Sequence, residues 1–228
     1  MSRDRALVIM AKAPREGSVK TRLNGAYPPH QISQLSECML RDTVALAQSL
    51  SGVQVAVMCP AEDVADIGGR LPANVQVVGQ QGAGLAAALD SVFDQFLPEF
   101  RHVVAVDSDS PHLPPAILRA AFELLETSEV VVGPTEDGGY YLVGASARHR
   151  RLFDRAPLGT STARDALLAN ARSLGLSVAL TEAWYDVDLP EDLRRLGAEL
   201  RRDPARAPRT AALLASWPAT DPRDERVG

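Results

Sequence analysis

The sequence predicts an α/β fold in which a mostly parallel, mixed central sheet lies between helical layers. Three observations support this prediction. Short runs of apolar residues, such as Val103–Val106, read as strands buried on both faces of a sheet. Longer segments with apolar residues at helical spacing separate these runs. Strands that alternate with helices form parallel sheets, and 228 residues suit one domain of this class.

The first half of the chain alternates strands and helices. We expect strands at 6–10, 53–57, 75–78 and 102–106, where apolar and β-branched residues gather. Ile32, Leu35, Met39, Leu46 and Leu50 fall on one helical face, and a short helix is expected at 62–70. The strongest helical stripe consists of Leu85, Leu89, Val92, Phe93, Phe96 and Phe100, which predicts a helix over 85–100.

The second half continues the alternation. The predicted strands lie at 130–132, 140–143 and 176–182, and the predicted helices at 114–127, 148–154, 161–174 and 190–201. Asp137-Gly138 stands between two of these strands, a pair of residues typical of a hairpin turn.

The chain is expected to form one domain over residues 1–202, followed by a tail over 203–228. After Arg202 the composition shifts to proline, arginine, alanine and aspartate. We predict a short helix at 208–216 and disorder at 219–228.

Composition restricts the class of partner. The net charge of −5 argues against binding to nucleic acid, which usually requires a basic surplus. No apolar run approaches the ~18 residues that a membrane span needs, and the segment 6–11 is too short for the core of a signal peptide. We therefore expect a cytoplasmic protein without a membrane partner.

Two aspartates directly follow the strand expected at 102–106. Asp107 and Asp109 are two residues apart, so they point to one face at the carboxyl end of the strand, where open α/β sheets bind ligands. Mg²⁺ takes one or two protein carboxylates and fills its other positions with water and substrate phosphates. The pair is a candidate metal site, although aspartates also end strands simply because they form turns.

A second acidic pair, Asp186 and Asp188, precedes the helix expected at 190–201. Asp188 followed by Glu191 resembles a capping box, with a proline in the first helical turn. Asp188 could instead complete a metal site with Asp109, since it lies at the end of the final strand region. Taken alone, the pattern favours the cap.

A basic loop follows the first strand. Residues 11–23 contain Lys12, Arg15, Lys20 and Arg22 but one acid, in a protein of net negative charge. A P-loop would need glycine where Pro14 and Val19 stand, so that motif is excluded. We favour phosphate binding by this loop over a merely solvated surface.

Two glycine-containing segments could face the same edge. Gly82 and Gly84 precede the Phe-rich helix, where exposed amides suit a phosphate or a base edge, although loop flexibility explains them equally well. Asp137, beside Gly138 and Gly139, could present a carboxylate to an acceptor molecule.

The order of these motifs resembles the nucleotide-diphospho-sugar transferase superfamily, whose members have the GT-A fold. The resemblance covers about residues 5–200 and is strongest to a bacterial glycosyltransferase-like family. Its Val-Lys-Thr-Arg-Leu, Ser-Asp-x-Pro and Asp-Gly-Gly-Tyr-Tyr-Leu motifs are matched at residues 19–23, 108–111 and 137–142. The resemblance implies a GT-A, Rossmann-like three-layer sandwich.

The same resemblance implies roles for single residues. Asp109 is then the main metal ligand and Asp188 the second, while Lys12, Lys20 and Arg22 line the nucleotide phosphates. Asp107, the third metal candidate, stands where members often have glycine. Residues 84–88 read Gly-Leu-Ala-Ala-Ala where members show Asp-Leu-Gly-x-Arg, and this stretch is closer to the phospholactate guanylyltransferases.

Three functions follow. The first is transfer of a glycosyl group from a nucleotide sugar to a small acceptor, with Mg²⁺ or Mn²⁺ stabilising the leaving nucleotide. The second is nucleotidyl transfer from a nucleoside triphosphate to a phosphorylated small molecule, with release of pyrophosphate. The third is a nucleotide-binding module without catalysis. For either enzyme we take Asp109, Lys20 and Asp137 as the catalytic candidates.

Overall fold

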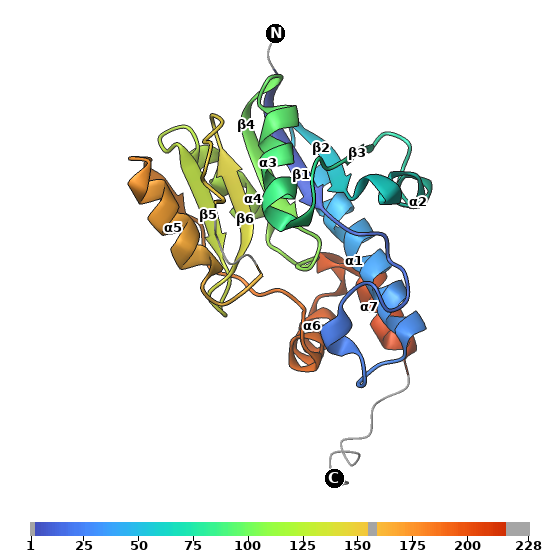
Figure 1. Cartoon of the computed structure of the whole chain (residues 1–228). Helices are drawn as coiled ribbons and strands as arrows, with labels where there is room; N and C mark the ends of the chain where they lie inside the picture. The colour runs from blue at the N-terminus through green and yellow to red at the C-terminus, as the bar shows by residue number, and fades with distance from the viewer. Residues whose placement is uncertain (1–2, 155–158, 218–228) are drawn as a thin grey trace.

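The computed structural model describes residues 3–154 and 159–217, and the described strands form one seven-stranded sheet (Figure 1). Residues 219–228, which were expected to be disordered, lie outside the described part of the chain. The strands are β1 (Arg3–Met10), β2 (Val53–Cys59), β3 (Gln76–Gly79), β4 (Phe100–Asp107), β5 (Val130–Pro134), β6 (Tyr140–Ala145) and β7 (Val178–Leu180). The helices are α1 (Pro29–Gln48), α2 (Val64–Arg70), α3 (Gly84–Phe96), α4 (Pro115–Leu124), α5 (Ala163–Ser173), α6 (Pro190–Arg202) and α7 (Pro208–Ser216), with short 3₁₀ helices η1 (Thr21–Leu23), η2 (Ala61–Asp63) and η3 (Pro204–Arg206).

The strand order is β3-β2-β1-β4-β6-β5-β7, and β6 runs antiparallel to its two neighbours. The chain leaves β1 toward β2 and β3, and then returns to pair β4 with the other side of β1. The order therefore reverses between β1 and β4, where Met10 lies opposite Asp107. Open α/β sheets bind their ligands outside the carboxyl ends of the strands at such a point.

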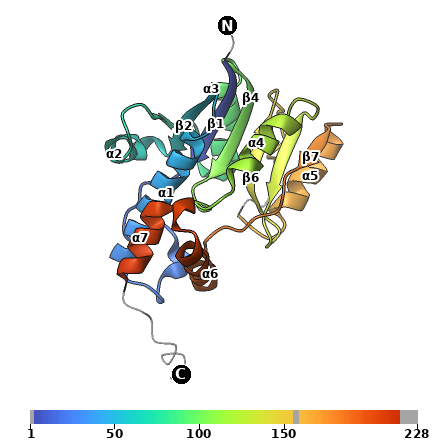
Figure 2. The ribbon, with the colours of Figure 1, turned by 180° about the vertical axis from the view of Figure 1, so that it is seen from behind.

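Helices cover both faces of the sheet. One core cluster packs α1 and α4 against the side chains of Leu7, Ile9 and Val104, and the other packs α3 and α5 against Val8 and Val103. Figure 1 shows α3 and α5 in front of the sheet, and Figure 2 shows α1 and α4 in front of the opposite face. Neighbouring residues of the central strands thus face different layers, which explains the continuous apolar runs Ala6–Ile9 and Val103–Val106.

A third core cluster lies beyond the carboxyl edge of the sheet. It packs the first half of α1 against α6, α7 and the extended segment that carries Tyr185 and Val187. The buried carboxylate of Asp42 on α1 accepts hydrogen bonds from the backbone N–H of Arg209 and from the N–H and hydroxyl of Thr210. These bonds attach α7 to α1 and place the acidic segment of residues 186–188 beside the switch point.

The structure confirms the predicted α/β class with a mostly parallel, mixed sheet and helices on both faces, and it confirms the hairpin turn at Asp137-Gly138. The predicted helix over 85–100 ends at Phe96, because Phe100 begins β4. No helix in the described ranges is long and apolar enough to span a bilayer.

The helix predicted at 148–154 is wrong, because these residues form turns. Arg151 has φ 73°, outside the helical region. The side chain of Asn170 on α5 donates to the carbonyl oxygens of Leu152 and Asp154 and holds these turns against α5.

Candidate functional site

A cleft of about 1160 Å³ opens at the carboxyl edge of the sheet, over the point where the strand order reverses. Its walls come from the ends of β1 and β4, the basic loop, the start of α3, the β5–β6 hairpin and the segment 186–188. The structure therefore brings every candidate site residue named from the sequence to one cleft. The amino terminus lies at the opposite end of the sheet (Figure 1).

The turn after β4 directs Asp109 into the cleft. The carboxylate of Asp107 accepts the backbone N–H of Asp109 at 2.9 Å, the aspartate turn that the sequence left open as an explanation. This bond fixes the backbone, and the carboxylate of Asp109 faces the cleft, with its side chain 37% exposed.

The second acidic segment runs alongside this turn. The backbone N–H of Val187 donates to the carbonyl of Asp109 at 3.0 Å, which brings Asp188 beside Asp109. The capping interpretation of Asp188 is wrong, because the side chain of Asp192 accepts the N–H groups of Asp188 and Leu189 instead. Asp192 caps α6, and the carboxylate of Asp188 remains available to the cleft.

Lys20 joins the two carboxylates. Its Nζ lies 2.7 Å from Oδ1 of Asp109, 3.5 Å from Oδ1 of Asp188 and 2.7 Å from the carbonyl oxygen of Val187. Burial would lower the pKa of the Lys20 ammonium, but the charges of Asp109 and Asp188 outweigh burial and raise it. Lys20 is therefore a buried cation held by three oxygens.

Asp186 is a site residue that the sequence analysis did not assign. Its carboxyl group is hydrogen-bonded to that of Asp107 and accepts the hydroxyl of Ser110 at 3.0 Å. Burial and the nearby charge of Asp109 raise the pKa of Asp186 to about 7, and burial together with Asp186 raises the pKa of Asp107 well above its usual value. Two adjacent carboxyl groups that share a proton avoid mutual repulsion. The two-residue spacing of Asp186 and Asp188 was the available sequence signal.

The basic loop divides into paired and free cations. Arg15 is paired with Asp63 and Asp66, so it attaches the loop to η2 and α2. Arg22 lies 3.6 Å from Asp188, with its side chain 57% exposed. Lys12 is exposed in the cleft and forms no ion pair with any residue in the described ranges.

The start of α3 presents backbone amides at the wall of the cleft. Gly82 and Gly84 have φ of 77° and 85°, which side-chain-bearing residues rarely adopt, so the loop needs glycine at both positions. The N-cap residue, Ala83, provides no capping side chain. The first amides of α3 are thus left without a side-chain acceptor at the wall of the cleft.

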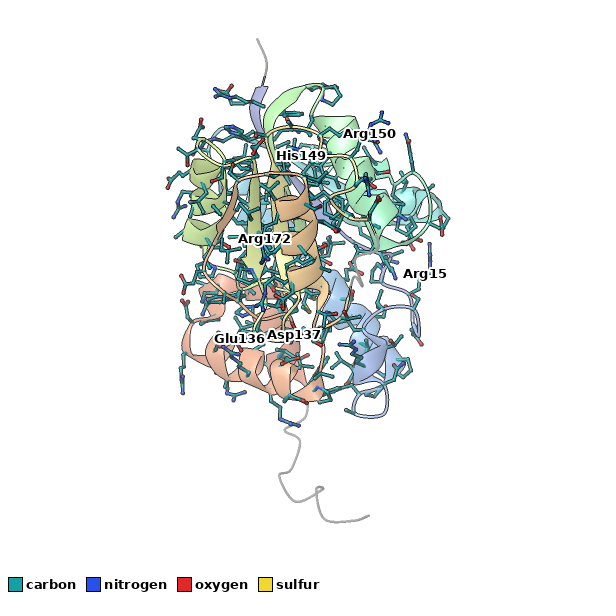
Figure 3. All side chains as sticks on the ribbon, turned by 60° about the vertical axis from the view of Figure 1, so that its left-hand side comes forward. Arg15, Glu136, Asp137, His149, Arg150 and Arg172 are labelled. Carbon is teal, nitrogen blue, oxygen red and sulfur yellow. The ribbon has the colours of Figure 1, made fainter. Side chains whose placement is uncertain are left out.

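The β5–β6 hairpin holds Asp137 opposite the basic loop. Oδ1 of Asp137 accepts the hydroxyl of Thr135 at 2.5 Å and the N–H of Gly139 at 3.1 Å. The bond from Thr135 lowers the pKa of Asp137, so this group stays a carboxylate. Its neighbour Glu136 accepts two hydrogen bonds, at 2.7 and 3.1 Å, from Arg195 on α6, and Figure 3 shows Glu136 and Asp137 side by side next to that helix.

The residues fit a divalent ion that shares its coordination with a substrate. Within the described residues, no three His, Cys, Asp or Glu side chains form a protein-only cage. Asp109 and Asp188 nevertheless both lie within 3.5 Å of one nitrogen, Nζ of Lys20. Two carboxylates suit Mg²⁺ or Mn²⁺, which take their remaining oxygen ligands from water and phosphate.

The sheet order and the position of the cleft match the GT-A-like, Rossmann-like arrangement that the sequence resemblance implied, and a structure described as a candidate nucleotide-diphospho-sugar transferase shares it. The family described as "uncharacterized protein conserved in bacteria" (DUF2064) matches residues 43–160, more than half of the chain. The chain belongs to this family. No curated protein matches the sequence.

Solved structures share the fold. A protein from Desulfovibrio desulfuricans G20, described as a candidate nucleotide-diphospho-sugar transferase, is 25% identical with a TM-score of 0.86, over 94% of this chain and 95% of that one. CMP:2-keto-3-deoxy-manno-octonic acid synthetase in complex with CTP is 14% identical with a TM-score of 0.57, over 88% and 100% of the two chains. The Rv0371c protein of Mycobacterium tuberculosis H37Rv, in complex with manganese, is 20% identical with a TM-score of 0.53, over 86% and 98%.

Proposed function

We propose that this protein is a divalent-metal-dependent transferase that acts on a nucleotide substrate and transfers a glycosyl group from a nucleotide sugar to a small acceptor. The convergence of Asp109 and Asp188 at the switch point carries the proposal. Two carboxylates that are open to a cleft, with cations around them, suit a metal–diphosphate group. The manganese bound by the Mycobacterium tuberculosis protein is compatible with this choice of ion.

Each wall of the cleft then has a role. Asp109 and Asp188 hold Mg²⁺ or Mn²⁺, which when bound neutralises charge on the departing nucleoside diphosphate. Lys12, Arg22 and the first amides of α3 face the phosphates. The half-buried Asp107–Asp186 pair supports the turn behind these groups and is left out of the proposed metal ligands.

Asp137 orients the acceptor. Thr135 and Gly139 occupy its Oδ1, which leaves Oδ2 to accept a hydrogen bond from an acceptor hydroxyl. A carboxylate whose pKa is lowered is a weak proton acceptor. Asp137 is therefore better suited to positioning the acceptor hydroxyl than to removing the proton from it.

The ion pairs favour glycosyl transfer over nucleotidyl transfer. Of the four cations in the basic loop, Arg15 is paired with Asp63 and Asp66, and Lys20 and Arg22 lie against Asp109 and Asp188. Lys12 together with the two cations at the carboxylates suits a diphosphate better than the higher charge of a triphosphate. The structural likeness to the Desulfovibrio desulfuricans protein supports the same choice.

Nucleotidyl transfer is the second candidate. The first amides of α3 lack a capping side chain and, with Lys12, provide additional positions for phosphate oxygens. The similar fold of a synthetase that binds CTP supports this alternative. In that reaction an acceptor phosphate attacks the α-phosphorus and pyrophosphate departs.

One assay separates these functions. The protein is incubated with Mn²⁺ or Mg²⁺, a pool of small hydroxyl- and phosphate-bearing acceptors, and each common sugar nucleotide or nucleoside triphosphate in turn. Release of nucleoside diphosphate is expected, whereas release of pyrophosphate would indicate nucleotidyl transfer. Asp109→Asn should abolish the metal-dependent release, and Asp165→Asn is the matched control because Asp165 lies on α5, 69% exposed. Nucleotide binding without any product would refute both enzyme functions and favour a binding module.

A further inference from the structure

The side chain of Lys20 occupies the position of a cation between the two proposed metal ligands. It is 4% exposed, and its ammonium group is surrounded by Oδ1 of Asp109, Oδ1 of Asp188 and the carbonyl oxygen of Val187. An ammonium group has three protons, and three oxygen acceptors satisfy them. The backbone of Lys20 is held in the left-handed conformation, with φ 45° and ψ 46°, at the start of η1.

The chain's own cations already balance the charge of the carboxylates. Lys20 lies against Asp109 and Asp188, and Arg22 lies 3.6 Å from the second oxygen of Asp188. A divalent ion that entered alone would meet two positive side chains at its ligands, so like charges would oppose its binding. A nucleoside diphosphate would bring negative charge for both cations.

We propose, on the basis of the function proposed above, that Lys20 competes with the divalent ion for Asp109 and Asp188. The ion then enters together with the phosphates of the nucleotide, which take up the displaced ammonium. A lysine suits this exchange, because its charge is a compact point on a flexible four-carbon stem. The substrate is accordingly the metal–nucleotide complex.

Lys12 makes a matched control. It carries the same charge and lines the same cleft, but it forms no ion pair with a described residue. Lys12→Met therefore changes the overall field of the cleft without freeing either carboxylate. Lys20→Met removes the charge together with its three contacts, whereas Lys20→Gln removes the charge but retains a hydrogen-bond donor.

The test measures Mn²⁺ binding by electron paramagnetic resonance of the free ion. Couplings between ligands are typically about 5- to 150-fold, so Lys20→Met and Lys20→Gln should bind Mn²⁺ alone about tenfold or more tightly than the wild type, whereas Lys12→Met should not. In EDTA, Lys20→Met should melt at a lower temperature than the wild type, and Mn²⁺ should raise its melting temperature more. A nucleoside diphosphate, tried over the common bases, should tighten Mn²⁺ binding in the wild type and much less in Lys20→Met.

Four results would overturn the proposal. They are unchanged Mn²⁺ affinity in both Lys20 variants, an equal gain in Lys12→Met, no tightening by any nucleoside diphosphate, and no measurable Mn²⁺ binding at all. In the first three cases, Mn²⁺ binding that Asp109→Asn abolishes would leave the proposed function standing. In the fourth case the metal dependence of the proposed function would fail as well.

Discussion

Replacement of Asp186 by asparagine should make the stability of the metal-free protein less dependent on pH. The folded pKa of Asp186 is about 7, because of burial and the charge of Asp109, whereas an aspartate in an unfolded chain titrates near 3.9. The folded state therefore binds this proton more tightly than the unfolded state. The resulting stabilisation is fully present below about pH 4 and is lost as the pH rises through about 7.

The magnitude follows from the size of the shift. One pKa unit corresponds to about 1.36 kcal/mol, so a full proton difference between pH 5 and pH 7 costs the wild type up to about 2.7 kcal/mol. Asp107 shares the proton with Asp186, which divides this cost between two groups. Asparagine does not titrate, and its side-chain oxygen can still accept the hydroxyl of Ser110. We expect the unfolding free energy of Asp186→Asn, relative to the wild type, to increase by about 1–3 kcal/mol between pH 5 and pH 8.

The assay is urea unfolding in EDTA at pH 5, 6, 7 and 8. Asp137→Asn serves as the control, because the pKa of Asp137 is lowered and its stabilisation is lost only as the pH falls through that low value. The difference in unfolding free energy between Asp137→Asn and the wild type should therefore stay constant from pH 5 to pH 8. If the difference in unfolding free energy between Asp186→Asn and the wild type also stayed constant, Asp107 and Asp186 would not share a proton.

Three further predictions concern the supports of the site. Asp42→Ala should lower the unfolding free energy by about 3 kcal/mol in urea and expose α7 to proteolysis, because buried donors at the start of that helix lose their acceptor; a loss below about 1 kcal/mol would contradict this. Arg195→Met should speed amide exchange in residues 136–139 about tenfold, since it removes the two bonds that attach the hairpin to α6; unchanged protection by exchange mass spectrometry would show that these bonds do not restrain the hairpin. Thr135→Val should raise the pKa of Asp137 in a carboxyl-detected NMR titration, because the bond from the Thr135 hydroxyl is the main cause of the lowered value; an unchanged pKa would exclude that cause.

Much of the fold could be predicted from residue patterns. The central strands bury both faces, so their apolar runs are visible without knowledge of the partners. The helix predictions failed at two places where the local residue pattern suggests a helix but the tertiary structure forms a strand or turns. Phe100 continues the apolar stripe of α3 in sequence but begins β4. Residues 148–154 contain turns that the side chain of Asn170, on α5, holds through two carbonyl oxygens.

The site was predictable in its residue types but not in its pairings. Acidic turns after strands and a basic loop pointed to one sheet edge, because parallel strands bring their carboxyl ends together. Which cation meets which carboxylate depends on segments far apart in the sequence. Arg15 forms an ion pair with Asp63, and Lys20 forms one with Asp109. Asp192, rather than Asp188, caps α6.

By itself, the sequence determined the alternation of strands and helices and the placement of acidic and basic residues at strand ends, because periodicity and turn chemistry are local. The tertiary structure alone decided that Asp107 meets Asp186 and that Lys20 lies between Asp109 and Asp188. These contacts depend on the packing of α6 and α7 against α1, which carries the segment of residues 186–188 to the carboxyl ends of β1 and β4. Burial and the neighbouring charges at that edge then set the ionisation of each group, and both result from the fold.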